Sequence, residues 1–183
     1  MAKWSNVPAV YGWLELTARG EWRIKGEPID NEAMRDFIGR NYTDDGCGNW
    51  FFQNGPQRVY VSLEATPIVH RLDEFGRLQG HTRAYPQELR AAFADAAGRL
   101  YLETDLGCGL VDSQDMPHFA ERIVDCEGRV LDEPLLARWA AGEGDAYLNP
   151  DGLHVRHDPL VRIARVDGGR LPEIFGFVAR PGP

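Results

Sequence analysis

The stretch Asn49-Trp-Phe-Phe-Gln-Asn-Gly-Pro-Gln-Arg-Val-Tyr-Val-Ser-Leu-Glu-Ala-Thr-Pro67 indicates the fold more clearly than any other part of the chain. It begins with an aromatic run at 50–52, and apolar side chains then recur at every second position of 57–63, which is the period of a β-strand. Asn54-Gly55 lies between the two runs and is a strong signal for a hairpin turn. The stretch therefore predicts a β-hairpin that Pro67 closes.

Weaker versions of this hairpin recur at residues 98–117 and 145–159, and each ends at a proline. A glycine turn, at Gly20, Gly76 and Gly128, precedes each of the three hairpins. The distance in sequence from one glycine turn to the next, and from one closing proline to the next, becomes shorter along the chain, so the repeat does not have the strict period of a solenoid. It fits a repeated β-α-β-β unit whose loops become shorter.

Apolar spacing predicts a short helix in each unit. After the strand pair 10–17 and 21–25, Asp30 is a suitable N-cap for the first helix, which fades near Tyr42. In the second unit, apolar residues at i, i+3, i+4 and i+7 from Leu89 predict a helix between Pro86 and Gly98. The third helix begins at Pro134 and ends before Gly142. Further strands are expected at 68–72, 118–124, 160–166 and 174–178.

These elements predict an α+β fold, with antiparallel sheets built from two or three repeated β-α-β-β units and short helices packed on the sheets. The units are 10–72, 73–124 and 125–178 of one chain that is compact from 1 to 183. The alternative is two subdomains, 1–72 and 73–183. Each unit is too small to be stable alone, so the units are expected to share a core.

The first unit resembles an uncharacterised bacterial family of domains of unknown function. The resemblance rests on Gly20-x-Trp22, Gly26-x-Pro28-Ile29, the helix, the aromatic strand and the closing Leu63-Glu64-x-x-Pro67, and it covers residues 10–72. It implies a cytoplasmic, two-part α+β protein. It carries over no catalytic residue.

Composition excludes several classes of partner. The chain has 183 residues and a formal net charge of −8, and it contains no run of lysine or arginine. This argues against nucleic acid and against an anionic membrane surface. The N-terminus lacks the apolar region of a signal peptide, and the three cysteines lack zinc-like spacing. We therefore expect a cytoplasmic protein with no cofactor and no metal site.

The candidate ligand-binding residues lie on the first hairpin, and four of them, Trp50, Gln53, Asn54 and Arg58, are lacking in the other two units. They combine aromatic rings with polar groups on one hairpin, which suits a small molecule or a protein partner. The set is Trp50, Phe52, Gln53, Asn54, Arg58 and Tyr60. No catalytic motif is present, so the sequence favours a non-catalytic binding or interaction protein. Pairing of strand edges would also allow a homodimer.

Two alternatives remain open. One is an enzyme with a His/Asp site at a unit interface, formed by Asp115, His118 and His157, where acid and imidazole would meet for acid–base work. The other is a structural subunit of a larger assembly. Convergent His and Asp side chains favour the enzyme, an apolar concavity favours ligand binding, and a flat apolar edge favours assembly.

Overall fold

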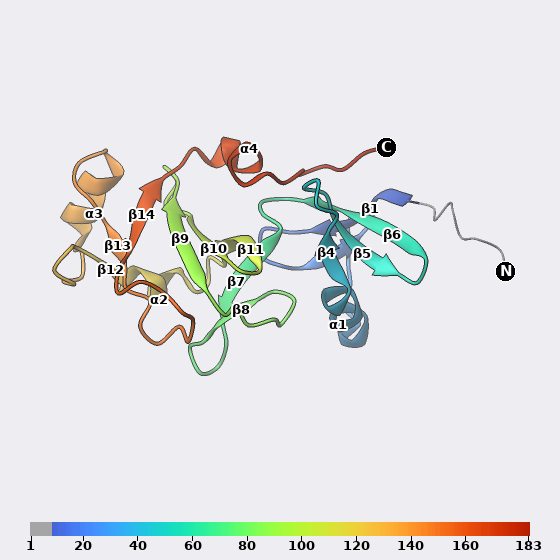
Figure 1. Ribbon diagram of the computed structural model, residues 1–183, viewed down its shortest axis with the longest axis horizontal. Coiled ribbons are helices and arrows are strands. Elements are labelled where there is room, and N and C mark those ends of the chain that lie inside the picture. The colour runs from blue at the N-terminus through green and yellow to red at the C-terminus, as the bar shows by residue number, and fades with distance from the viewer. Residues whose placement is uncertain (1–8) are drawn as a thin grey trace.

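The first of two β-sheets is formed by the N-terminal third of the chain. The structure is a computed structural model that describes residues 9–183, shown in Figure 1. Within that range the first sheet has six strands in the order β3-β2-β1-β6-β5-β4. Their bounds are β1 Ala9–Leu16, β2 Trp22–Ile24, β3 Glu27–Pro28, β4 Tyr42–Asp44, β5 Trp50–Asn54 and β6 Gln57–Leu63. Helix α1, Glu32–Arg40, connects β3 to β4.

The second sheet has eight strands among the described residues, in the order β12-β13-β14-β9-β10-β11-β7-β8. Their bounds are β7 Ile68–Leu72, β8 Leu78–Gly80, β9 Leu89–Ala94, β10 Leu100–Thr104, β11 Gly107–Val111, β12 Ile123–Val124, β13 Tyr147–Leu148 and β14 Val161–Arg165. The helices that accompany it are α2 Met116–Ala120, α3 Glu133–Ala140, the 3₁₀ turn η1 Gly168–Arg170 and α4 Leu171–Phe175. The protein is therefore α+β, as predicted.

Both sheets are mixed, so the prediction of purely antiparallel sheets is wrong. β1 pairs in parallel with β6, β11 with β7, and β14 with β9. Parallel neighbours require a long crossover connection, and the pairing partner then lies far away in sequence. Hairpin signals detect only strands that are adjacent along the chain, so they miss these three pairs.

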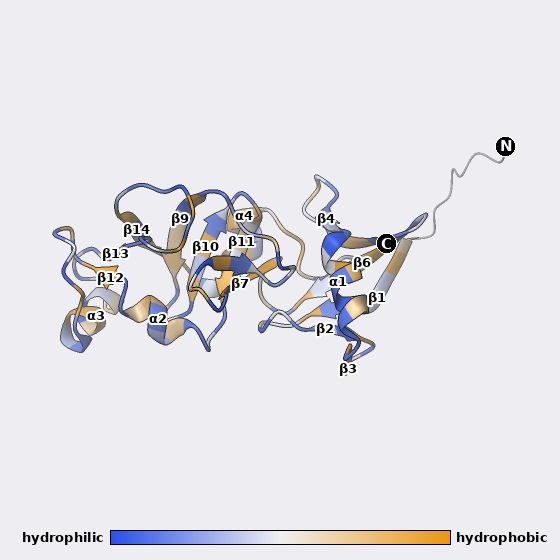
Figure 2. Cartoon of the chain, turned by 90° about the horizontal axis from the view of Figure 1, so that it is seen from below, coloured by the Kyte–Doolittle hydropathy of each residue, from blue (hydrophilic) through white to orange (hydrophobic). Residues whose placement is uncertain are grey.

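Two hydrophobic cores lie on opposite faces of the second sheet. Leu100 and Leu102 of β10 belong to a core that α2 and α3 cover through Phe119 and Trp139. Tyr101, between them, faces a second core that is shared with the first sheet. In Figure 2 the hydrophobic segments, in orange, lie along the strands, whereas the connecting loops are mostly hydrophilic. The middle strands of the second sheet are thus buried on both faces.

The C-terminal segment returns from the second sheet to the first, and Figure 1 shows the C-terminus beside β1 and β6. The N–H of Leu63 donates to the carbonyl of Ala179 at 2.8 Å, and the N–H of Val178 donates to the carbonyl of Gly48 at 2.8 Å. The predicted strand at 174–178 is wrong, because the chain forms α4 and then leaves it at Gly176, which has a left-handed φ of 65°.

Several local predictions are confirmed. The opening stretch is the β5–β6 hairpin, and 98–117 contains the β10–β11 hairpin. The first helix is present, but its N-cap is Asn31 rather than Asp30: Oδ1 of Asn31 accepts the N–H of Met34 at 2.9 Å. The third helix is α3, whose N-cap is Asp132.

Three other predictions are wrong. The expected helix between 86 and 98 is strand β9, which pairs with β10 and β14. The expected strand at 118–124 begins with the last three residues of α2, continues as a turn, and has only the two residues of β12 extended. At 145–159 no local hairpin forms, because β13 pairs with β12 and β14. The second and third units therefore differ from the first, and the repeated β-α-β-β unit is not confirmed. The division into units or subdomains stays a prediction.

A smaller element does recur, the turn Asp-x-x-Gly-Arg. It is found at Asp73–Arg77, Asp95–Arg99 and Asp125–Arg129. In each turn the aspartate carboxylate accepts backbone N–H groups two and four residues later and the Nε–H of the arginine. The glycine in each turn has a φ of 77° to 81°. Two of the three glycine turns that suggested a repeated domain, those at Gly76 and Gly128, therefore belong to a repeated turn, and the turn at Gly20 has a different sequence.

No helix among residues 9–183 is long and apolar enough to cross a membrane.

Candidate functional site

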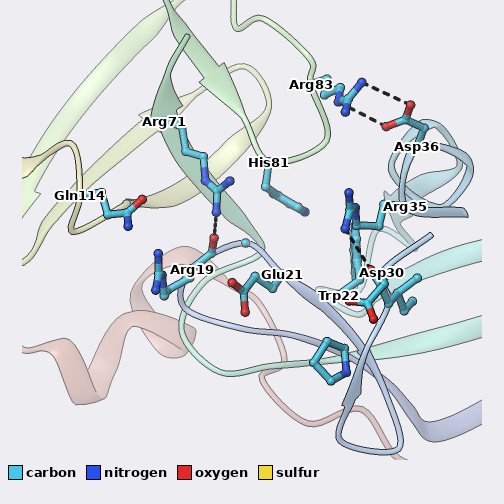
Figure 3. A pocket seen from close by; sticks show the side chains of 13 residues that line it. Arg19, Glu21, Trp22, Asp30, Arg35, Asp36, Arg71, His81, Arg83 and Gln114 are labelled. Carbon is cyan, nitrogen blue, oxygen red and sulfur yellow. Dashed lines mark hydrogen bonds and ion pairs between the residues drawn. The ribbon is translucent and has the colours of Figure 1, made fainter. Parts of the chain in front are cut away.

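A cavity of about 520 Å³ opens between the two sheets. One wall comes from the first sheet and α1, and the other comes from β7, the segment after β8 and the turn before α2. Figure 3 shows polar side chains from both walls around the opening. The lining residues are Arg19, Gly20, Glu21, Trp22, Pro28, Ile29, Asp30, Arg35, Asp36, Arg71, His81, Arg83 and Gln114.

His81 lines this cleft, and the neighbouring strand β7 holds it in place. Its N–H donates to the carbonyl of Val69 at 2.8 Å, and the N–H of Val69 donates to Nδ1 of His81 at 3.2 Å. Because Nδ1 accepts, the proton of the neutral ring lies on Nε2. Nε2 is buried and has no hydrogen-bond partner among the described residues. The cleft therefore contains an unused hydrogen-bond donor.

Aromatic packing holds the imidazole ring in place. The ring centroid lies 5.2 Å from that of Trp22 and 5.6 Å from that of Tyr42. Gly20 approaches so closely that a Cβ there would lie 2.8 Å from Cβ of His81. A larger residue at position 20 would displace the imidazole, so this glycine is required by close approach as well as by its φ of 74°.

Burial keeps the imidazole neutral. Desolvation, together with the neighbouring His70 and Arg71, lowers the pKa of His81 to about 3. A ring with this pKa is neutral near pH 7, so Nε2 acts as a neutral N–H donor rather than as part of a cation. It is also a weak general base at that pH, which argues against proton abstraction by His81.

Two arginines join the walls of the cleft. Arg83 pairs with Glu32 at 2.6 Å and Asp36 at 3.3 Å, both on α1. Arg71 pairs with Asp112 at 3.1 Å and donates to the backbone carbonyl of Arg19. Figure 3 draws the ion pair of Arg83 with Asp36 and the hydrogen bond from Arg71 to the carbonyl of Arg19. The charges of these two arginines are thus largely neutralised by the protein itself.

Four other charged side chains of the cleft are exposed, and three of them, Arg19, Arg35 and Asp30, form no ion pair in the described part of the chain. Arg35 donates to the carbonyl of Ile29 at 3.2 Å, and Arg19 forms no ion pair. The nearest cation to Glu21 is Arg23, at 4.0 Å, and Asp30 forms no ion pair. The cleft therefore presents two guanidinium groups and two carboxylates to solvent.

A second cavity, of about 490 Å³, lies between β4–β5, β9–β11 and α4. It contains Trp50, Glu103 and Cys108. Burial raises the pKa of the Cys108 thiol to about 12, so this cysteine is not an activated nucleophile. No group of three His, Cys, Asp or Glu side chains that could hold a metal ion is found in residues 9–183.

The structure does not bring the six hairpin candidates into one cavity. Trp50 lines the second cavity. Phe52 and Asn54 line a separate apolar groove of about 140 Å³ beside Trp13. Gln53, Arg58 and Tyr60 project from the other face of the hairpin. There Arg58 lies over Phe51, and Tyr60 stacks on Tyr11 at 4.6 Å. The prediction that these six bind a ligand stays a prediction.

The residues of the enzyme alternative are engaged elsewhere. The carboxylate of Asp115 accepts the N–H of Leu72 at 2.9 Å. His118 is exposed on α2, and His157 lies near the carbonyl of Asp158, at 2.7 Å from Nδ1. No hydrogen bond or ion pair within the described ranges joins these three residues to one another.

Sequence reasoning missed His81 and the arginines of the cleft. A lone histidine after a short strand has no distinguishing motif, and the cleft residues come from segments 19–36, 71–83 and 114. The pattern Gly20-x-Trp22 does belong to the cleft, but from the sequence it was recognised only as part of the family resemblance and not as a sign of a site.

Comparison with known proteins gives the family and the fold. A family model, DUF2944, described as "Protein of unknown function (DUF2946)", matches residues 1–182. This confirms the resemblance to an uncharacterised domain family. No curated protein matches the sequence.

Among solved structures, the chain is similar to a DUF1285 family protein from Silicibacter pomeroyi DSS-3. The identity is 16% and the TM-score 0.52, over 86% of this chain and 84% of that chain. It is also similar to a DUF1285 family protein from Shewanella baltica OS155, with 15% identity and a TM-score of 0.42, over 58% of this chain and 89% of that chain. The first likeness shows a shared fold.

Proposed function

The chain belongs to the DUF2944 family, and we propose that it is a non-catalytic binding protein that holds a small oxyanion-bearing molecule in the cleft between its two sheets. The oxyanion is a carboxylate or a phosphate. His81, Arg19 and Arg35 bind it, and Arg71 and Arg83 hold the two walls in place around it.

The observation that carries this proposal is the unpartnered Nε2–H of His81. A buried donor without an acceptor costs about 1–3 kcal/mol of stability, so such groups are rare unless water or a ligand satisfies them. The Nε2 atom is buried within the wall of the cleft. A carboxylate or phosphate oxygen is the strongest acceptor that a ligand can offer to it.

The side chains around His81 are suited to binding an oxyanion. The guanidinium groups of Arg19 and Arg35 line the same cleft and are free of ionic partners among the residues described. Guanidinium groups donate in a planar fork that matches the oxygens of carboxylates and phosphates. The volume of about 520 Å³ lies within the range of roughly 300–1,000 Å³ that ligand pockets have in general.

Thermal unfolding in the presence of a panel of small carboxylates and phosphates tests this function. A ligand at about a hundred times its dissociation constant adds roughly 2.7 kcal/mol, which raises the melting temperature of a chain of this size by about 5–10 °C. The shift is expected to disappear in Arg19→Ala and in His81→Phe, which keeps an aromatic ring without its nitrogens. Arg138→Ala, an exposed arginine on α3, should keep the shift. A full shift in both cleft variants would refute the proposal.

The hairpin residues supply a rival location for the same ligand. If Arg58→Ala abolishes the shift and Arg19→Ala does not, the ligand binds on the face of β5–β6 that was predicted from the sequence.

A protein-interaction surface is a second candidate function. Trp13 is 52% exposed beside the apolar groove at Phe52, and Met34 and Phe37 of α1 are exposed next to it. Exposed apolar side chains in one patch are typical of interaction surfaces. Sedimentation of the wild-type chain and of Trp13→Ser tests the homodimer form of this function: a dimer that the substitution dissociates supports it, and a monomeric wild-type chain refutes it.

A further inference from the structure

The charged side chains of the cleft specify more than an oxyanion. Four guanidinium groups and three carboxylates line the cavity. Arg83 is neutralised by Glu32 and Asp36, and Arg71 by Asp112. Arg19 and Arg35 then remain as cations and Asp30 as an anion, and the exposed Glu21 has only Arg23, at 4.0 Å, as an ionic partner. When the partners Arg23, Glu32 and Asp112 are counted with the lining residues, the cleft has five guanidinium groups and five carboxylates, so its charges are balanced.

We propose that the ligand is a zwitterion with a carboxylate and an ammonium group, as in a free amino acid or a short peptide. This inference rests on the proposed function. The carboxylate accepts from Nε2 of His81 and from the guanidinium groups, and the ammonium group donates to Glu21 and Asp30. Figure 3 shows an acidic and a basic side chain on each side of the opening: Glu21 beside Arg19, and Asp30 near Arg35.

The balance of charge explains why a plain anion fits this cleft less well. An anion placed between Arg19 and Arg35 also lies near the carboxylates of Glu21 and Asp30, and like charges at close range oppose binding. A zwitterion places a positive group against those carboxylates instead. Each of the four charges then has an opposite charge nearby.

The charge of the whole chain acts in the same direction. With a formal net charge of −8, the chain repels an anion on approach. A zwitterion has no net charge, so this long-range repulsion does not slow its association. The neutral imidazole also fits, because a neutral N–H donor binds a carboxylate without adding a positive charge that would repel the ammonium group.

The test compares matched ligands by isothermal titration calorimetry on the full chain. The panel consists of free amino acids and simple dipeptides, each measured beside its N-acetyl derivative, which retains the carboxylate and lacks the ammonium group. We expect at least one amino acid or dipeptide to bind at least about tenfold more tightly than its N-acetyl derivative. Succinate and inorganic phosphate serve as plain oxyanions.

Substitutions then assign the preference to the cleft. Asp30→Asn and Glu21→Gln are expected to weaken binding of the parent ligand about tenfold and to leave the N-acetyl derivative within about twofold. Glu121→Gln, an exposed residue at the end of α2, is the control and should change neither. Both cleft carboxylates are exposed, so their loss is compatible with folding.

The outcomes separate this inference from the function on which it rests. If N-acetyl derivatives, succinate or phosphate bind as tightly as the zwitterions, the ligand is a plain oxyanion and only the zwitterion is refuted. If a zwitterion binds but both carboxylate substitutions leave its affinity unchanged, the assignment of the ammonium group to Glu21 and Asp30 is refuted. If no member of the panel binds, the inference and the proposed function both fail.

Discussion

Replacing Asp95 with alanine is expected to destabilise the protein much more than the same change at Asp125, although both begin an Asp-x-x-Gly-Arg turn. In both turns the carboxylate accepts two backbone N–H groups and an arginine. Asp95 also accepts the hydroxyl of Tyr101 at 2.9 Å. Tyr101 is 0% exposed, so its hydroxyl loses its partner and cannot reach water after the substitution.

The magnitude follows from these contacts. An unsatisfied buried hydroxyl costs about 1–3 kcal/mol. The backbone hydrogen bonds are part-buried at Asp95 and exposed at Asp125, and in either turn they together contribute about 1–2 kcal/mol. The arginines are 51% exposed at Arg99 and 71% exposed at Arg129, so each ion pair adds at most about 1 kcal/mol. We expect a loss of about 3–5 kcal/mol for Asp95→Ala and about 1–2 kcal/mol for Asp125→Ala.

Urea unfolding at pH 7 measures both losses, and a double-mutant cycle with Tyr101→Phe isolates the hydroxyl. In the Tyr101→Phe background the excess cost of Asp95→Ala over Asp125→Ala should fall to within about 0.5 kcal/mol. Equal losses for the two aspartates in the wild-type background would contradict the reasoning. So would an excess that persists when the hydroxyl is absent, because the turn itself would then account for it.

Three further predictions concern buried groups. Gly109→Ala places a Cβ 2.4 Å from the His70 ring, so it should cost more than about 3 kcal/mol in urea unfolding, whereas Gly182→Ala, with open space around it, should cost almost nothing. Burial lowers the pKa of His70 to about 4 from an ordinary 6.5, so the unfolded chain binds more protons between these pH values. Stability is therefore fully present above about pH 6.5 and falls as the pH drops toward 4; His70→Gln should flatten this dependence, and an unchanged slope would contradict the assignment. Cys108 is buried and the other two cysteines are exposed, so a thiol reagent should modify two thiols in the native chain and the third only in urea; three equally fast reactions would exclude the buried position.

Local features could be predicted because their hydrogen bonds join residues that are only a few positions apart in the sequence. The turn at Asn54-Gly55 needs only a left-handed backbone, and the alternation that follows it sets the faces of β6. At α3 the order of Asp132 and Pro134 specifies the start of the helix directly. The same reasoning placed the first helix and misplaced its cap by one residue.

The strand β9 shows why local pattern fails in the centre of this fold. Its residues have the spacing of a helix, yet β9 lies between β10 and β14 and contributes apolar side chains to the cores on both faces of the sheet. Ala92 packs in one core and Phe93 packs against the other. A strand with two buried faces has no polar side, so it loses the period-two signal and resembles an apolar helix.

The sequence by itself determined the α+β class, the β5–β6 and β10–β11 hairpins, two of the helices and the family, because each depends on residues close together in the chain. The tertiary structure alone decided the parallel pairings, the second core and the cleft. His81 has a free donor only because Val69 occupies Nδ1, and it lines the same cleft as Arg19 only because the second sheet packs against the turn at Gly20. Contacts between residues some 60 positions apart depend on how both sheets pack, and no local pattern encodes them.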